Sequence, residues 1–219
     1  MKMAKQSARI IADPQCDGME ALRRVEYAAR NCYASQNKIT EDSCVRFVKS
    51  LIQRGHDAPL EFADMTVDIT TSRAVLAELT RHRLSSFCVE SQRYIQEASS
   101  GDILFIQPEW YDETEEDEAS AIWHSCMRMA ENGYVRMIKE GEKPEVARDV
   151  LPNATACRII MKANLREWRH VFALRCSTAA YPPMRQLMRS ILAQAHELYP
   201  VVFDDLAEQY LTEGDAHHE

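Results

Sequence analysis

The chain has 219 residues, 46% of them hydrophobic, which is enough to bury a core and form one domain. Its formal net charge of −8 argues against broad nucleic-acid binding, because attraction to the phosphate backbone needs an extended basic surface. No apolar run approaches the roughly 18 residues of a membrane span and the N-terminal run is too short for a signal peptide, so we expect a soluble cytoplasmic protein with no nucleic-acid or membrane partner.

The cysteines, histidines and glycines exclude several kinds of site. The seven cysteines are odd in number and scattered without a CxxC pair, which predicts reduced thiols rather than disulfides or a zinc site. No HxH or HExxH spacing joins the internal histidines, so no metal site is expected. No GxGxxG, P-loop or GxSxG motif occurs, and a bound nucleotide or flavin would therefore need a non-Rossmann fold.

Hydrophobic spacing near the N-terminus predicts one short strand and two helices. ARIIA at 8–12 is typical of a strand, and Asp17 is placed to cap a helix with apolar residues at helical spacing. A second helix is expected from about Glu41, and it should end near Gly55, because glycine commonly follows the last turn of a helix.

The middle of the chain alternates strand and helix signals. Residues 62–70 alternate between apolar and polar side chains, which predicts a strand. Ser72 should cap a helix of about ten residues, RAVLAELTRHR, and residues 86–94 should be loop or strand. The carboxylates at 110–118 favour the start of a long helix that reaches about Glu140, since acidic groups are stabilised at a helix N-terminus.

The last third is expected to be mainly helical. Pro144 fits the first turn of a short helix that ends at Leu151-Pro152, a longer helix spans about 164–176, and another follows Pro182. Residues 212–219 are expected to be a frayed tail. Many helices with few strands predict an α+β fold in one domain over residues 1–219.

The stretch TRHRLSSFCVESQRY concentrates basic groups in an acidic chain. Glu78, Arg81 and His82 are expected to share one helix face, and alone they would favour an intrahelical salt bridge on the surface. Ser91 and Arg93 follow at alternate positions, so in an extended segment both side chains point to one side. A hydroxyl beside a guanidinium suits a phosphate group, which arginine binds through two parallel hydrogen bonds.

A second basic cluster lies in ANLREWRHVFALR, at 163–175. Arg166 and His170 share a helix face, whereas Arg175 lies about 140° round from His170 and an unbroken helix would aim it elsewhere. That separation favours two ligands, or one long ligand, over a single small anion. The alternative is a solvated surface, but surface arginines need no periodicity and no neighbouring asparagine such as Asn164.

Several motifs, in the same order along the chain, resemble the flavin-dependent thymidylate synthase family. Arg81-His82-Arg83, followed after seven residues by Ser91, resembles the RHRx7S signature of that family. GHDAPLEF resembles its GHxSxxEH stretch, EVARDVLP its ExxRxxLP stretch, and NLREWRHVFALR its late arginine helix. With SQRY after the signature, these motifs cover roughly residues 50 to 180.

The resemblance implies helices packed around a central antiparallel sheet, and a homotetramer with active sites between subunits. It implies FAD as cofactor, NADPH as reductant, methylenetetrahydrofolate as one-carbon donor, and dUMP as the substrate that is methylated to dTMP. Fixed arginines suit this chemistry, because negative charge must build on the uracil ring. The flavin supplies the redox step, and no cysteine nucleophile is required.

The family pattern implies roles for the residues at matching positions. It implies that Arg175, facing the uracil, and His56, near the flavin and folate, are catalytic, although a lone histidine after a helix is more often a cap or a packed side chain. The residues that it places at the cofactor are Arg81, His82, Arg83, Asn164, Arg166 and His170. Those that it places at the nucleotide are Glu78, Arg81, Glu90, Ser91, Gln92, Arg93, Arg148 and Arg175.

The chain departs from the family pattern at several positions. Phe62 stands where the family usually has histidine, Ala58 where Ser or Thr sits near the flavin, and Cys88 and Val89 replace polar residues. AAYPPMR at 179–185 replaces HAQxEIR, which bears on the last pocket wall. Two alternatives stay open: a family-like flavoprotein that has lost folate chemistry, and a nonenzymatic protein that binds a nucleotide or RNA through its arginine clusters.

Overall fold

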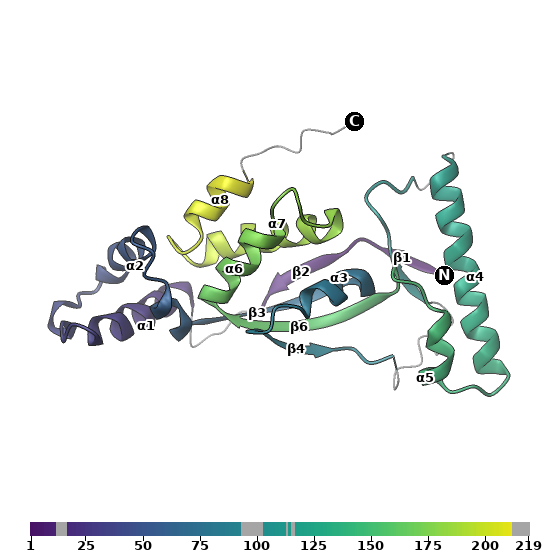
Figure 1. Ribbon diagram of the computed structural model, residues 1–219, viewed down its shortest axis with the longest axis horizontal. Coiled ribbons are helices and arrows are strands. Elements are labelled where there is room, and N and C mark those ends of the chain that lie inside the picture. Colours follow the sequence, from purple (N-terminus) through teal and green to yellow (C-terminus); the bar gives the residue numbers. More distant parts are fainter. Residues whose placement is uncertain (12–16, 93–102, 113, 115–116, 212–219) are drawn as a thin grey trace. The chain divides into compact units, whose positions relative to one another are not determined.

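The computed structural model describes residues 1–11, 17–92, 103–112, 114 and 117–211 (Figure 1). Arg93 and the expected frayed tail at 212–219 lie outside these residues. The chain forms two compact units, and the prediction of one domain over residues 1–219 stays a prediction. The first unit comprises Met1–Ser7, Ile69–Arg81 and Phe87–Ile160, and the second comprises Ala8–Asp68, His82–Ser86 and Met161–Glu219.

A four-stranded antiparallel sheet has the strand order β2-β3-β6-β4 (Figure 1). Its strands are β2 (Ser7–Ile10), β3 (Asp64–Ser72), β6 (Ala156–Asn164) and β4 (Ser86–Val89). The two central strands are also the longest, and in β6 the alternate residues Cys157, Ile159, Met161 and Ala163 are buried. The α+β fold with an antiparallel sheet is therefore confirmed, as are strands near 8–12 and 62–70.

The first unit has its own small sheet and core. Strand β1 (Lys2–Ala4) pairs in parallel with β5 (Leu104–Ile106). Ile103, Phe105 and Tyr134 are fully buried in one apolar cluster, and the buried carboxylate of Glu131 accepts a hydrogen bond from the Ile103 amide at 2.9 Å. The helices of this unit are α3 (Arg73–Leu79), α4 (Glu118–Lys139), α5 (Pro144–Ala147) and the 3-10 helix η3 (Arg148–Val150).

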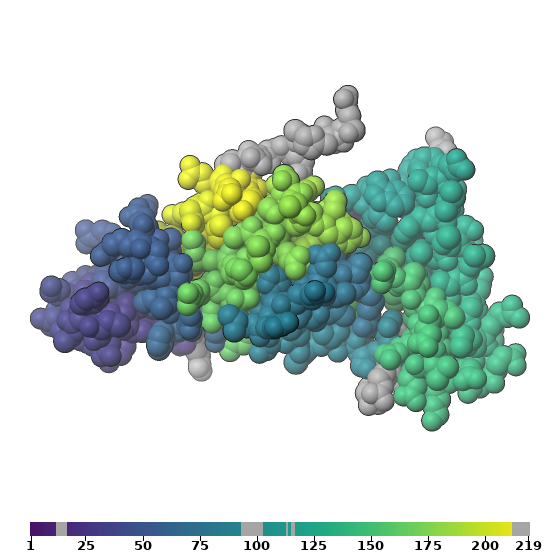
Figure 2. Space-filling model, in the orientation of Figure 1, coloured from purple at the N-terminus to yellow at the C-terminus, as the bar shows by residue number. Residues whose placement is uncertain are grey.

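The second unit is mostly helical. Helices α1 and α2 pack side by side, and α6, α7 and α8 form the green and yellow surface in Figure 2. Its core contains Trp168, Phe172 and Phe203, with 5.4 Å between the ring centroids of each successive pair. Its helices are α1 (Gly18–Asn31), α2 (Ser43–Gln53), α6 (Leu165–Arg175), α7 (Pro182–Leu198) and α8 (Asp204–Leu211), with 3-10 helices η1 (Gln36–Lys38) and η2 (Ala58–Phe62).

Side-chain caps fix most of the predicted helix starts. Asp17, Ser72 and Asn164 each accept a hydrogen bond from the backbone amide three residues later, as N-cap residues do. Asp117 does the same for α4, which runs to Lys139 and confirms the long helix expected there. The sequence signals that placed these helices were therefore local and correct.

The predicted extent of the helix after Ser72 is wrong. Helix α3 ends at Leu79, where the Thr80 hydroxyl donates to the Leu76 carbonyl at 3.2 Å. The expected shared helix face of Glu78, Arg81 and His82 therefore does not exist, because Arg81 and His82 follow the helix. His82 is buried, and its ring packs in the second unit instead.

Strands β1, β5 and β6 and helix α8 were not predicted. The alternation in β6 was readable in the sequence as Cys, Ile, Met and Ala at every second position. The short strands β1 and β5 have three residues each, too few for a period to be visible. Within the part of the chain that the structure describes, no helix combines the length and the apolar composition needed to cross a bilayer.

Gly18 tests the packing of the second unit. A Cβ atom at this position would lie 1.6 Å from the backbone oxygen of Leu198, which is the last residue of α7. We expect Gly18→Ala to lower the free energy of unfolding by about 2 kcal/mol, measured by urea denaturation, since a backbone clash of this kind forces the two helices apart. The matched control is Gly133→Ala in α4, where the added atom meets Val150 Cγ2 at an ordinary 3.6 Å and stability should rise by up to about 1 kcal/mol. Equal effects of the two substitutions would contradict the expectation.

Candidate functional site

His82 is the buried centre of a polar cluster in the second unit. The residue is 5% exposed, and its Nε2 atom lies 3.0 Å from Arg175 Nε. Its Nδ1 atom faces the Glu167 carboxylate, 3.6 Å from Oε1. The His170 ring stands nearly perpendicular to it, with 6.1 Å between the ring centroids. Residues 82 and 164–175, far apart in the sequence, thus meet at one imidazole.

The hydrogen bond with Arg175 fixes the protonation of His82. A guanidinium group only donates, so His82 Nε2 must carry a lone pair and the ring proton must sit on Nδ1. Burial, together with the neighbouring Arg175 and His170, lowers the pKa of His82 to about 4. His82 is therefore neutral at physiological pH.

Helix α6 holds the other members of the cluster. Its N-cap is Asn164, and Trp168 anchors it through an indole N–H that donates to the Met65 carbonyl at 2.9 Å. Helix α6 is unbroken as far as Arg175, its last residue. Arg175 was expected to point away from His170, toward a second ligand or another part of one long ligand. Both side chains instead lie against the ring of His82.

The remaining basic residues of α6 have different environments. Arg169 binds both carboxylate oxygens of Asp205, at 2.8 and 2.7 Å, and also donates to the Val202 carbonyl. It therefore ties α6 to α8 and the turn before it. Arg166 is exposed and makes a 2.6 Å ion pair with Glu61 of η2.

The other residues that the resemblance places at the cofactor are exposed. Arg83 is exposed one position after His82 in the second unit, and Arg81 is exposed at the end of the first unit. His56 is exposed in the second unit. It follows Gly55, whose φ of +69° lies just after the end of α2, and the His56 backbone amide donates to the Leu51 carbonyl at 2.9 Å. The role of each stays a prediction.

The residues that the resemblance places at the nucleotide lie mainly in the first unit. Glu90 follows β4 and is held there on both sides, since its amide donates to the Arg158 carbonyl at 2.9 Å and its carbonyl accepts from Arg73 Nη2 at 3.2 Å. Gln92 is 9% exposed, and its Nε2 atom has no hydrogen-bond partner among the residues that the structure describes. A buried amide donor without a partner indicates that a ligand or another group accepts from it.

The other residues that the resemblance places at the nucleotide lie elsewhere in the first unit, apart from Arg175 in the second unit and Arg93 outside the described residues. Glu78 is in α3, Arg148 begins η3, and Ser91 follows Glu90. The predicted common side of Ser91 and Arg93 is not tested, because Arg93 lies outside the described residues.

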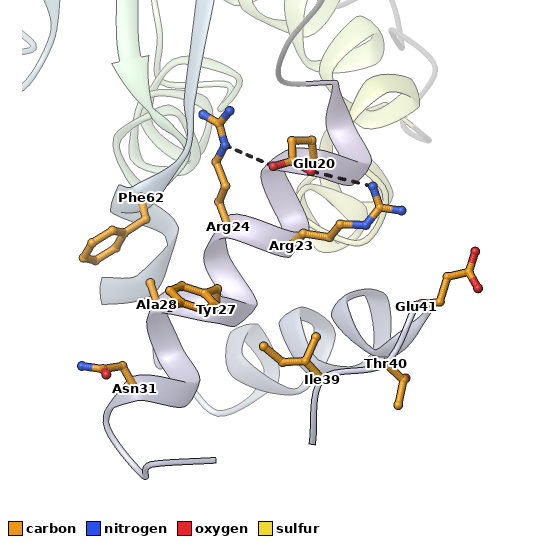
Figure 3. Close-up of a pocket in the computed structure, with 10 residues that line it drawn as sticks. All are labelled: Glu20, Arg23, Arg24, Tyr27, Ala28, Asn31, Ile39, Thr40, Glu41 and Phe62. Carbon is orange, nitrogen blue, oxygen red and sulfur yellow. Dashed lines mark ion pairs between the residues drawn. The ribbon is translucent and has the colours of Figure 1, made fainter. Parts of the chain in front are cut away.

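A separate hollow of about 900 Å³ lies beside α1 in the second unit (Figure 3). Tyr27 of α1 and Phe62 of η2 border it, and Phe62, which departs from the family pattern, is 65% exposed. Arg23 and Arg24 reach back to Glu20, at 3.8 and 3.5 Å. None of the residues predicted for the cofactor or the nucleotide lines this hollow, so it does not define the candidate site.

Glu167, which lies beside His82, and Arg73, which donates to the Glu90 carbonyl, were not singled out from the sequence. Glu167 is three residues after the Asn164 cap, a spacing typical of a capping box, and this local signal conceals its contact with a histidine 85 positions away. Arg73 follows the Ser72 cap and carries a buried Nε that has no partner among the described atoms.

Cys176, next to Arg175, is fully buried, and burial raises the pKa of its thiol to about 12 although nearby Arg189 opposes the rise.

Comparison with solved structures places the fold. A crystal structure of the UMP/dUMP methylase PolB from Streptomyces cacaoi, bound with 5-Br dUMP, superposes with a TM-score of 0.76 at 22% sequence identity. The match covers 96% of this chain and 98% of the other. At that identity the likeness establishes a common fold.

Comparison of sequences establishes the family. A family model described as thymidylate synthase complementing protein matches residues 16–201. The probable flavin-dependent thymidylate synthase of Mycobacterium phage L5 is 32% identical over 210 residues, covering 90% of this chain and 85% of the relative. The flavin-dependent thymidylate synthase of Geobacter sulfurreducens is 33% identical over 195 residues, covering 86% of this chain and 83% of the relative. The chain belongs to the flavin-dependent thymidylate synthase family, which confirms the resemblance.

The pKa of His82 predicts a pH dependence of stability. Between about pH 6.5 and 4 the unfolded chain binds a proton at this residue and the folded chain does not, so stability is full above pH 6.5 and is lost as the pH falls toward 4. His82 should contribute about 3 kcal/mol to the loss in the free energy of unfolding. This contribution should be absent in His82→Gln, whose amide does not titrate. The difference between the free energies of unfolding of the two proteins, measured at pH 7 and pH 4, checks this. An identical pH dependence in both proteins would show that His82 has an ordinary pKa.

Proposed function

We propose that this protein methylates dUMP to dTMP, with FAD as cofactor, NADPH as reductant and methylenetetrahydrofolate as one-carbon donor. The observation that carries the proposal is the meeting of two family motifs, Arg81–Arg83 and 164–175, at the buried His82–Arg175 hydrogen bond. Membership of the flavin-dependent thymidylate synthase family supports the same conclusion. The related UMP/dUMP methylase, which binds 5-Br dUMP, supports a uridine monophosphate as substrate.

The proposed reaction balances without a nucleophile from the protein. The uracil C5–H is replaced by a methyl group, and the methylene carbon that becomes this methyl group needs two electrons. NADPH supplies them as a hydride and becomes NADP⁺, one proton is taken up overall from solvent, and the folate leaves as tetrahydrofolate. A bound flavin would supply the hydride transfer, while the protein would supply orientation and electrostatic field.

Arg175 is proposed to stabilise negative charge on the uracil ring. Its guanidinium is half-buried, and its Nε is held by His82, so its direction is set before substrate binds. Because His82 is neutral, it orients this cation without adding a second charge or neutralising the first. A preorganised cation in a site with little water stabilises developing negative charge more than a mobile surface arginine does.

The polar groups near this cluster suit a flavin and a nucleotide phosphate. The side-chain oxygen Oδ1 of Asn164 accepts from the Glu167 amide at 2.8 Å, so the helix cap does not use the side-chain NH₂ group. Arg83 and Arg166 present exposed guanidinium groups in the same unit, and such groups bind phosphate and ring carbonyl oxygens. Considered by itself, the first unit contains the Gln92 amide, which has no partner among the described residues and offers a buried donor for the nucleotide.

The assembly and the location are proposals as well. The family resemblance supports a homotetramer in which the walls of each site come from different subunits, and a cytoplasmic location. His56 and Arg81 are exposed in the single chain, as they would be if a neighbouring subunit or a ligand covered them in the assembly.

The purified protein should be yellow and should release FAD on denaturation. With dUMP, methylenetetrahydrofolate and NADPH it should form dTMP, measured by chromatography. NADPH oxidation without dTMP would favour the flavoprotein that has lost folate chemistry. A colourless protein that takes up no FAD, and whose binding of nucleotides falls steeply with salt, would favour the nonenzymatic alternative.

Replacing Arg175 tests its assigned role. We expect Arg175→Ala to lower kcat for dTMP formation by about 100-fold or more, because the charge stabilisation of the transition state is lost, while FAD content and fold are retained. Arg175→Lys should recover part of the rate, since a charge remains but the planar fork does not. Arg46→Ala, at an exposed arginine of α2, is the matched control and should keep wild-type activity. Full activity of Arg175→Ala would remove Arg175 from the mechanism.

A further inference from the structure

The buried carboxylate of Glu167 has a position that helix capping does not explain. Its backbone amide is the group bound by the Asn164 cap, so the side chain is not needed to start α6. The residue is 6% exposed, and Oε1 points at the Nδ1 side of His82 from 3.6 Å. A buried carboxylate is costly unless a donor or a positive charge faces it, so this placement requires a compensating partner.

His82 provides that partner. Because Arg175 Nε only donates, His82 carries its proton on Nδ1, and Oε1 of the Glu167 carboxylate lies 3.6 Å from that nitrogen. Among the residues that the structure describes, the charged or titratable groups recorded against the ring are Glu167, Arg175 and His170. Glu167 is the one among them that favours a proton on Nδ1.

Helix geometry explains why the histidine is needed between the two residues of α6. Glu167 and Arg175 are eight positions apart, so their backbones are separated by about 12 Å along the axis and the side chains do not pair directly. The ring of His82, which comes from a different segment, bridges the first turn of α6 to its last residue.

We propose that Glu167 is a positioning residue, which holds the Nδ1–H form of His82 so that Nε2 accepts from Arg175 and aims its guanidinium at the substrate. The last step rests on the proposed function, whereas the proton position does not. Without the carboxylate, the Nδ1–H form loses the acceptor that faces its proton and is favoured only by the hydrogen bond from Arg175, so the form with a proton on Nε2 becomes more populated. The form with a proton on Nε2 would turn a donor toward the Arg175 donor, which breaks their hydrogen bond and lets the guanidinium move.

The proton position is measured directly by NMR of the protein labelled with ¹⁵N at histidine. In the wild-type protein at pH 7, the Nδ1 signal of His82 should be that of a proton-bearing nitrogen and the Nε2 signal that of a nitrogen with a lone pair. His82→Gln, which lacks these signals, assigns them. A wild-type His82 with its proton on Nε2 overturns the proposal, whatever any variant does.

Two substitutions test the action of Glu167 on Arg175. Glu167→Leu should shift part of His82 to the form with a proton on Nε2 and lower kcat for dTMP formation by about 10- to 100-fold, as the loss of an outer orienting group commonly does. KM for dUMP should change by no more than about threefold, because contacts to the substrate are kept. Glu167→Gln keeps an oxygen acceptor and should keep both the Nδ1–H form and a rate within about threefold of wild type.

The controls separate positioning from folding. Glu197→Leu, at an exposed glutamate of α7, makes the same chemical change and should alter neither the spectra nor the rate. A Glu167→Leu protein with unaltered His82 signals and full kcat overturns the proposal, as does a Glu167→Gln protein that loses activity with its His82 signals unchanged. If Glu167→Leu does not fold, the wild-type spectrum and Glu167→Gln decide. If the wild-type protein forms no dTMP, the proposed function fails while the spectra still test the proton position.

Discussion

The hydrogen bond between Arg175 and His82 is the contact on which the candidate site depends. It joins the last residue of α6 to the segment after α3, 93 positions earlier in the chain. Arginine is always a donor, so this one contact dictates both the proton position and the neutral charge of the imidazole. Burial keeps water from competing for it and lowers the pKa of His82 to about 4. The direction of the Arg175 guanidinium then follows from the packing of His82.

The fold provides the rigidity that this contact needs. Helix α6 is held at its start by the Asn164 cap, in its middle by the Trp168 indole and at its side by the Arg169–Asp205 pair. Because the backbone of α6 is fixed in this way, only the side-chain torsion angles of Arg175 are left to be fixed by the contact with His82. Arg169 therefore contributes to the structure of the cluster, although the sequence alone grouped it with the other basic residues of this helix.

How far the sequence predicts the structure depends on the distance over which each signal acts. Helix starts were predicted correctly because Asp17, Ser72 and Asn164 bind amides three residues away. The end of α3 was placed too late, since the departure of His82 from the helix is driven by contacts with α6 that no local pattern shows. The family motifs named Arg175 and His82 as site residues, but Glu167 was concealed by its capping position. The short strands β1 and β5 could not be predicted, because their pairing is set by partners about 100 residues away.

Cys176 has a consequence for the chemistry of the protein in oxidising conditions. Oxidants and alkylating reagents attack the thiolate, and burial together with a pKa of about 12 keeps this sulfur in the unreactive thiol form beside Arg175. Cys32, Cys88 and Cys126 are exposed and would react first. The residue that follows Arg175 in the chain is thus chemically inert, so oxidants that modify the exposed cysteines leave this end of α6 unmodified.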